Sequence, residues 1–176
     1  TSGYIFPDWR GTVYPAHLRE RDMLGYYLHT WQFNALEWNV TFYRVPDEAQ
    51  CARFAARLPP AFALAVKAHR DITHRPLDSA TASLCTAFRA ALAPLRTEHK
   101  LACVLLQFPY AFHDTAKHRE HVRVCRAALS DLPLAVEFRH DSWNTVGTAA
   151  FLRKLAASFC AVDEPALTGL IPWTDF

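Results

Sequence analysis

The sequence lacks a strong charge of either sign and lacks paired cysteines. Nineteen Lys and Arg residues against 17 Asp and Glu give a net charge of +2, and no basic run is present. A dedicated nucleic-acid-binding protein usually carries a clear basic excess, so nucleic acid is not favoured as a partner. The cysteines form no C-x-x-C pair and are odd in number, which predicts reduced thiols in a cytoplasmic protein. They are Cys51, Cys85, Cys103, Cys125 and Cys160.

Long hydrophobic runs, a signal peptide and low-complexity linkers are also absent. No apolar run reaches the roughly 18 residues that a membrane-spanning helix needs, so no membrane association is predicted. With 51% hydrophobic residues among 176, the chain can bury a sizeable core. Without an internal linker, we predict a single domain over residues 1–176. The chain starts at Thr1 within a strand-like segment, which indicates a piece of a longer protein.

Short β-rich runs alternate with longer helical runs along the chain, which is typical of parallel βα units. The predicted strands are residues 1–6, 35–43, 62–69, 101–108, 132–140 and 160–165. The predicted helices are residues 20–33, 47–58, 79–98, 115–129 and 146–159. Pro94 is expected to disturb the third helix. Six strands separated by helices fit either a doubly wound sheet or most of a (β/α)8 barrel.

Side-chain alternation within the strands decides between these two folds. In the strand 132–140, Ala135, Glu137 and Arg139 share one face, and the opposite face carries bulky apolar groups. The strands 35–43 and 62–69 alternate in the same way. A doubly wound sheet is covered by helices on both faces and should be apolar on both, whereas a barrel interior becomes polar near its opening. We therefore predict an α/β fold of the TIM-barrel type, here an incomplete (β/α)8 barrel with about six parallel strands.

Five motifs, in order along the chain, resemble those of a known family. They are TSGYIFPDWRGTVYP, LEWNVTFYRVP, FALAVKAHRDITH, VLLQFP and LAVEFRHDSW. This series is similar to the YecE-like family, domain of unknown function 72, over essentially the whole chain. The resemblance implies a (β/α)8-like barrel of which roughly the last third is missing here, and it implies no established activity. Two departures from the family pattern, Tyr4 in place of Trp and Val40 in place of Ser or Ala, would alter a pocket wall.

Polar residues at the carboxyl ends of the predicted strands form the candidate site, because ligands of α/β barrels bind at that end. Glu137 and Glu37 are the candidate general acid and general base, since two carboxylates in different environments can divide these roles. Lys67 is a further catalytic candidate, either as a cation that holds an anionic group or as a base or nucleophile. The candidate substrate-binding residues are Arg139, Asn39, His69, Gln107, Asp163, Tyr4 and Trp143.

Each of these residues also has an ordinary structural interpretation. Lys67, Glu137 and Arg139 can form a self-satisfied ion network that fills the barrel, because buried charges need partners whatever their role. His69 and His74 lack zinc-type spacing and are better explained by hydrogen bonding, so no metal is predicted. Asp163 can cap a helix, and Trp143 can anchor a loop.

Three functions stay open at this point. The converging charges favour an enzyme of hydrolase type, which acts by acid–base chemistry on a small polar or anionic substrate. The second interpretation is a phosphodiester-directed protein, either nuclease-like or nucleic-acid-binding, and the third is a non-catalytic sensor or scaffold. Fold alone does not choose among them. The sequence does not indicate the substrate, a cofactor or the oligomeric state.

Overall fold

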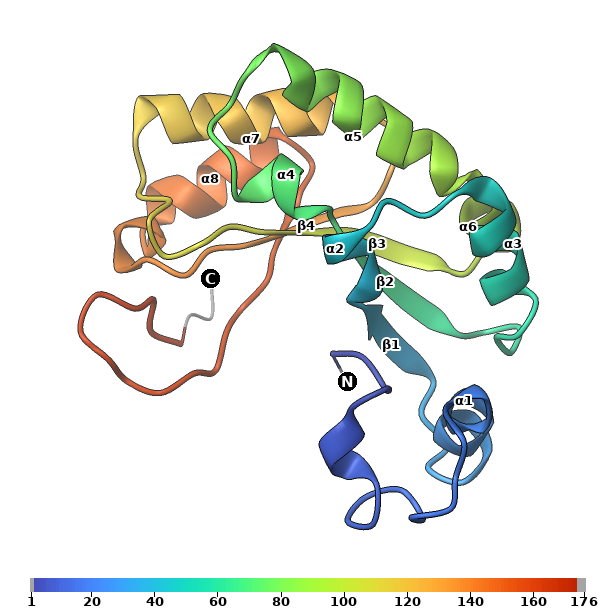
Figure 1. Cartoon of the computed structure of the whole chain (residues 1–176). Coiled ribbons are helices and arrows are strands. Elements are labelled where there is room, and N and C mark those ends of the chain that lie inside the picture. The colour runs from blue at the N-terminus through green and yellow to red at the C-terminus, as the bar shows by residue number, and fades with distance from the viewer. Residues whose placement is uncertain (1, 174–176) are drawn as a thin grey trace.

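Five parallel strands lie in the sheet in the same order as in the sequence. The computed structural model describes residues 2–173. The strands are β1 (Ala35–Trp38), β2 (Ala63–Lys67), β3 (Leu101–Gln107), β4 (Leu134–Glu137) and β5 (Ser158–Phe159). A doubly wound sheet reverses its strand order at a switch point, whereas a barrel wall adds each strand beside the previous one. The sequential order therefore confirms the predicted α/β fold of barrel type (Figure 1).

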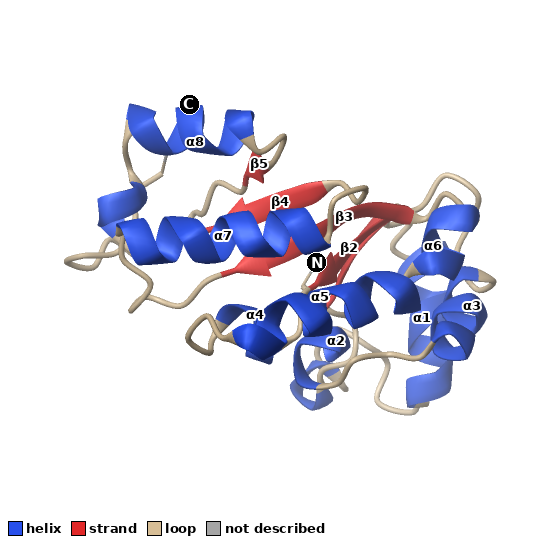
Figure 2. Cartoon of the chain, turned by 90° about the horizontal axis from the view of Figure 1, so that it is seen from above, coloured by secondary structure: helices blue, strands red, loops and turns tan. Residues whose placement is uncertain are grey.

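Helices connect the strands and cover one face of the sheet. They are α1 (Glu20–His29), α2 (Val40–Tyr43), α3 (Glu48–Ala55), α4 (Arg70–Thr73), α5 (Ser79–Ala91), α6 (Ala93–Thr97), α7 (Ala116–Ala128) and α8 (Val146–Lys154). Two 3-10 turns, η1 (Pro7–Trp9) and η2 (Asp141–Trp143), lie in connecting segments. Helices α5 and α7 pack side by side over the middle strands (Figure 2).

Local sequence signals set most helix boundaries. Asp47 and Gln50 form a reciprocal capping box at the start of α3, and the Thr115 hydroxyl accepts a hydrogen bond from the amide of His118 at the start of α7. Both arrangements satisfy amides that the first helical turn leaves unpaired. Pro94 lies at the second position of α6 and separates it from α5, which confirms the disturbance predicted within residues 79–98.

The first and the last of the predicted strands, residues 1–6 and 160–165, were wrong. Residues 1–6 form no strand within the part that the structure describes, and only Ser2 makes an isolated parallel bridge, to Glu37. Residues 160–165 are irregular, and the last strand is instead β5, which falls inside the predicted helix 146–159. That helix ends at Lys154, because Ala156 adopts a left-handed conformation with φ of 48° and turns the chain into β5 early. Residues 2–173 thus hold five strands rather than about six.

The strand predicted over residues 35–43 is also shorter than expected. It ends at Trp38, and residues 40–43 turn into the single-turn helix α2. The Thr41 hydroxyl donates a hydrogen bond of 2.6 Å to the backbone oxygen of Lys67 and so ties α2 to the end of β2. This turn brings the side chains of Val40, Phe42 and Tyr43 to the carboxyl ends of the strands.

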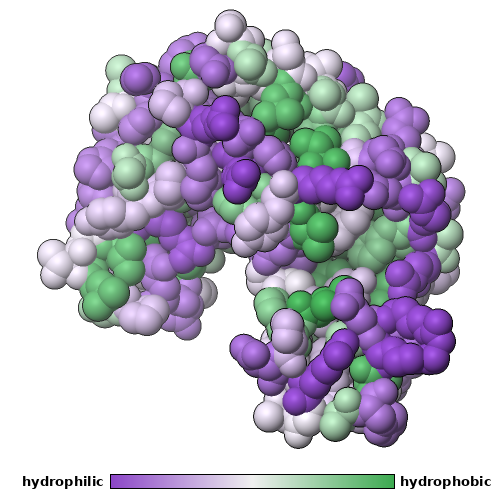
Figure 3. Space-filling view, viewed as in Figure 1, coloured by the Kyte–Doolittle hydropathy of each residue, from purple (hydrophilic) through white to green (hydrophobic). Residues whose placement is uncertain are grey.

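Successive side chains along each strand point alternately to the core beneath the helices and to the inner face of the barrel wall. Leu64 and Val66 of β2 are fully buried on the outer face, beneath the helices, and Val104 and Leu106 of β3 continue this layer. The inner face carries the small or polar side chains Ala63, Ala65 and Lys67, as the sequence predicts. Figure 3 shows the molecule hollowed on one side, and Figure 1, in the same view, places the N-terminal segment and the segment after β5 on either side of this hollow.

None of the helices within residues 2–173 has both the length and the apolarity that crossing a bilayer requires. The longest, α5 and α7, have 13 residues each, whereas a spanning helix needs about 20.

Candidate functional site

Glu37 and Lys67 lie side by side at the carboxyl ends of β1 and β2. The Lys67 Nζ is 3.9 Å from Glu37 Oε1, and both side chains are mostly buried, with 15% and 23% exposed. Ser2 lies above them, where its hydroxyl donates to Glu37 Oε1 at 3.2 Å and accepts from the amide of Asn39. The N-terminal segment therefore holds Glu37 in place, and the three predicted residues Glu37, Asn39 and Lys67 lie close together.

A cavity of about 330 Å³ opens beside this ion pair. Its polar lining is Glu37, Asn39 and Lys67, and aromatic rings form most of the rest. The rings belong to Tyr4, Phe6, Trp38, Phe42 and Tyr43. Lys67 Nζ lies 5.0 Å from the centroid of the Phe42 ring, within the range of a cation–π contact. The size and the lining, apolar walls with a few convergent polar groups, are those of a small-molecule site.

A second group of charges lies at the end of β4. Arg139 Nη2 is 2.6 Å from Glu137 Oε1, and Arg139 also pairs with Glu164 in the segment after β5. Glu137 Oε1 is thus engaged by the Arg139 guanidinium, whereas Arg139 Nε and Glu164 Oε1 are buried without a hydrogen-bond partner among the described residues. An unsatisfied buried polar atom is costly, so these two atoms are the part of the group that a bound ligand would satisfy.

Electrostatic coupling joins the two groups of charges. Burial raises the pKa of Glu137 above its usual 4.5, Arg139 and Lys67 oppose that shift, and Glu37 adds to it. Lys67 and Glu37 act on Glu137 from β2 and β1, across the intervening strand β3, so the three side chains share one electrostatic environment.

Two thiols face the same opening and were not predicted there. Cys160 Sγ lies 3.9 Å from Glu137 Oε2, and burial, with the nearby carboxylates, raises the pKa of Cys160 to about 11. Burial and Glu37 likewise raise the pKa of Cys103. Cys103 lies two and four residues before Leu105 and Gln107 along β3, and side chains two residues apart in a strand share a face. The alternation of the strand therefore predicts Cys103 on the inner face.

The remaining predicted binding residues divide into two sets. Tyr4 lines the cavity, and Gln107 pairs in register with Glu137 at the end of β3. His69, by contrast, caps α4, since its Nδ1 accepts from the amide of Asp71 at 3.2 Å. Asp163 is exposed to solvent and makes no ion pair with the described residues, and its neighbour Glu164 reaches Arg139 instead.

Trp143 does not lie at the rim, which corrects its assignment as a binding residue. Its side chain is 0% exposed and stacks on Phe138 with ring centroids 3.8 Å apart. Its indole N–H donates to the backbone oxygen of Phe112 at 2.6 Å. The 3-10 turn η2 directs this ring into the core rather than toward the opening.

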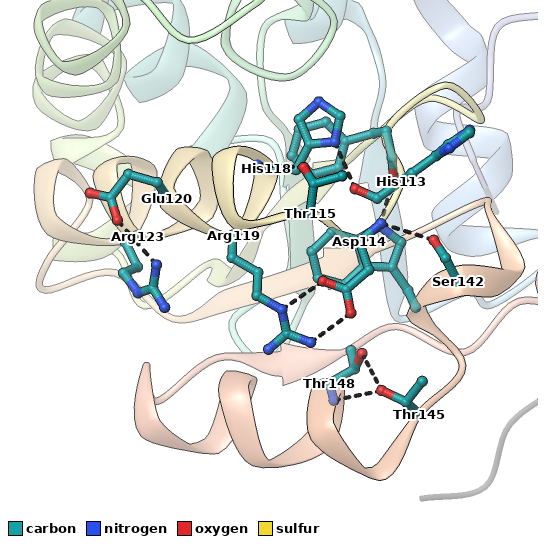
Figure 4. Close-up of polar contacts among 12 residues, drawn as sticks. His113, Asp114, Thr115, His118, Arg119, Glu120, Arg123, Ser142, Thr145 and Thr148 are labelled. Carbon is teal, nitrogen blue, oxygen red and sulfur yellow. Dashed lines mark hydrogen bonds and ion pairs between the residues drawn. The ribbon is translucent and has the colours of Figure 1, made fainter.

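Polar contacts brace the loops that surround Trp143 (Figure 4). Arg119 of α7 binds both carboxylate oxygens of Asp114, each at 2.6 Å. The amide of Asp114 donates to the Ser142 hydroxyl at 2.9 Å. These contacts tie the loop between β3 and α7 to the turn after β4, and so fix the rim on which Arg139 lies.

Gly169 should be essential to the segment that carries Glu164. It has φ of +83°, and a Cβ there would lie 2.2 Å from the hydroxyl of Tyr110. Gly169→Ala should lower the free energy of unfolding by about 1–2 kcal/mol from backbone strain alone, and further through the clash. Urea unfolding should show a smaller loss in a Tyr110→Phe background. Gly25→Ala, inside α1 with open space around it, is the control and should stabilise the protein slightly.

Comparisons with known proteins give one consistent relationship. The chain matches the family described as "Protein of unknown function DUF72" over residues 1–174. It is 28% identical over 171 residues to UPF0759 protein YunF of Bacillus subtilis (strain 168), which covers 92% of this chain. The chain spans 60% of the length of that curated relative.

Solved structures agree with this relationship. The crystal structure of the DUF72 family protein TM1631 from Thermotoga maritima superposes on this chain with a TM-score of 0.87 at 34% sequence identity. The superposition covers 99% of this chain and 67% of the TM1631 chain. The DUF72 family protein EF0366 from Enterococcus faecalis has the same fold, with a TM-score of 0.78 at 24% identity over 88% of this chain and 65% of its own. The resemblance seen in the ordered motifs is therefore confirmed, and this chain belongs to the DUF72 family of proteins of unknown function.

Proposed function

We propose that this protein is an enzyme that binds a small polar or anionic ligand at the carboxyl ends of β1, β2 and β4 and acts on it by acid–base chemistry. The observation that carries this proposal is the group Glu137, Arg139 and Glu164, in which Arg139 Nε and Glu164 Oε1 are buried without a hydrogen-bond partner among the described residues. One is a donor and the other an acceptor, so a ligand with both hydroxyl and acceptor groups would satisfy them. Buried polar atoms in folded proteins are usually paired, so two unpaired ones beside an opening favour a ligand there.

Two carboxylates in different environments support acid–base chemistry. Glu137 is buried and has a raised pKa, which suits a general acid. Glu37 lies beside the Lys67 ammonium and accepts a hydrogen bond from Ser2, both of which are partners for a carboxylate and suit a general base. Pairs of titratable groups whose environments differ in this way commonly divide acid and base roles. A hydrolytic reaction uses both roles.

The cations in the site favour a ligand with negative charge or many hydroxyl groups. Lys67 lines the cavity, and Arg139 has one unpartnered nitrogen, Nε. A guanidinium group binds carboxylate or phosphate oxygens through parallel hydrogen bonds, and the aromatic walls can pack against a sugar ring. We therefore propose sugars, sugar phosphates and small carboxylic acids as the ligand classes to test.

Lys67→Met tests the ligand-binding half of this proposal. We expect at least one of those classes to raise the melting temperature of the wild-type protein, and the variant to bind that compound roughly tenfold or more weakly, because a hydrogen bond to a charged group is lost. The matched control is Lys154→Met on the exposed surface of α8, which should bind as the wild type does. The proposal fails if no class stabilises the wild type or if both variants respond alike. Stabilisation only by short oligonucleotides would instead indicate a phosphodiester-directed protein.

A further inference from the structure

A second cavity, of about 210 Å³, lies between the segment after α4 and the start of α7. We call it the basic cavity, because five of its lining residues carry basic side chains and none is acidic. The basic residues are His74, Arg75, Lys117, His118 and His121. It lies outside the site described above, although the His74 ring contacts Phe42, which lines the first cavity. None of the sequence motifs predicted it, since these residues come from two separate segments.

Two of the histidines are fixed by the protein through one ring nitrogen each. His118 Nδ1 donates to the backbone oxygen of His113 at 2.6 Å, and His121 Nε2 donates to the backbone oxygen of Ile72 at 2.8 Å. A carbonyl oxygen only accepts, so each of these nitrogens must carry a proton. The second nitrogen of each ring makes no hydrogen bond with residues 2–173. His121 lines the cavity although its side chain is only 1% exposed overall.

The neighbouring cations are only partly neutralised. Lys117 makes no ion pair with the described part of the chain, and Arg75 pairs with Asp71 at 3.0 Å. Asp78 is engaged in capping α5, where it accepts hydrogen bonds from the amides of Ala80 and Thr81. The cavity therefore holds an excess of positive charge, and the described residues offer no cluster of His, Cys, Asp and Glu that could hold a metal ion.

We propose that the basic cavity binds an oxyanion with the size and charge of a phosphate group, held by Lys117, His118 and His121. Its volume is below the 300–1,000 Å³ that is usual for drug-sized ligands, which fits a group of this size. The rings of His118 and Phe112 stack at 4.1 Å, so the His118 imidazole is already oriented before a ligand arrives. The inference does not depend on the acid–base function proposed above.

Oxyanion binding at this place should be coupled to proton uptake. The second nitrogen of His121 can donate to an anion only when the ring is protonated. Burial lowers the pKa of His121, with a smaller contribution from His118, while the bond to Ile72 and the charge of Asp78 oppose the shift. The ring is therefore neutral in the free protein near neutral pH, and a bound anion restores its proton. Affinity should rise as the pH falls from 8 to 6.

Calorimetric titration with sodium sulfate, at an ionic strength held constant with sodium chloride, tests this proposal. Sulfate keeps its charge over this range of pH, whereas phosphate does not. We expect saturable binding whose affinity rises by up to about tenfold per pH unit for each proton taken up. Lys117→Gln and His118→Gln should each weaken binding by about tenfold. Inorganic phosphate should compete with sulfate.

Matched controls separate a built site from general charge screening. Lys154→Gln removes the same charge from α8, far along the chain from the cavity, and should bind sulfate as the wild type does. Equal weakening in Lys154→Gln and Lys117→Gln, or the absence of saturable sulfate binding, would overturn the proposal. Glu137→Gln should leave sulfate binding unchanged, so a failure of the acid–base function and a failure of the oxyanion site would give different results.

Discussion

Replacing Trp143 with alanine should lower the free energy of unfolding by about 3–5 kcal/mol, the usual cost of removing a large aromatic side chain from a core. The ring is fully buried, stacks on Phe138 at 3.8 Å and donates to the Phe112 backbone oxygen. Its removal leaves a cavity and an unsatisfied buried carbonyl. Urea unfolding of the purified variant measures the loss.

Two further variants make this expectation specific. Trp143→Phe keeps the stacking but loses the hydrogen bond, so its stability should fall between wild type and Trp143→Ala. Trp173→Ala removes a side chain that is 67% exposed and should change stability by less than about 0.5 kcal/mol. If Trp143→Ala unfolded with the same free energy as Trp173→Ala, the assignment of Trp143 to the core would be wrong.

Replacing Glu137 with glutamine should abolish turnover while leaving the fold intact. Loss of a general acid typically costs 10²- to 10⁴-fold in rate, and the amide cannot supply the proton. The measurement is the rate on the compound that stabilises the wild type, compared with Glu98→Gln, which removes an exposed carboxylate at the end of α6. An unchanged rate in Glu137→Gln would exclude the proposed role.

The same substitution should alter how stability depends on pH. Because burial raises the pKa of Glu137 above 4.5, the folded protein favours the protonated side chain more than the unfolded chain does. Its stabilising contribution is therefore complete below about pH 4.5 and is lost as the pH rises through the raised value. Glutamine mimics the protonated form at every pH. We expect Glu137→Gln to lack this loss and to be at least as stable as the wild type at pH 7, whereas a variant less stable at pH 7 would contradict it.

The sequence was sufficient to predict the barrel wall because its strands alternate cleanly. Leu64 and Val66 on one side and Ala65 and Lys67 on the other follow directly from a period of two. The predictions of the first and last strands were wrong because strand formation there depends on pairing with a neighbouring strand rather than on residue composition. Ser2 makes a single bridge, and β5 consists of two residues that pair with β4, too few to leave a periodic signal.

The site was predictable where side chains belong to strands and not where they belong to loops. Glu37 and Lys67 lie 3.9 Å apart at the ends of adjacent strands, as their strand positions indicated. Loop residues followed local backbone geometry, which composition does not encode: His69 caps α4, and Trp143 enters the core. The partner of Arg139 comes from a segment 25 residues away along the chain, so no local pattern could distinguish Glu164 from Asp163.

The alternation of side chains between the two faces of each strand affects how the sequences of this family can diverge. Glu37, Lys67 and Glu137 each belong to a different βα unit, and their immediate neighbours along the strand face the helices instead. A substitution such as one at Lys67 changes what the opening recognises without disturbing Val66 or Ala68, which are buried beneath it. The side chains at the opening can therefore change in one βα unit at a time while the buried core stays the same.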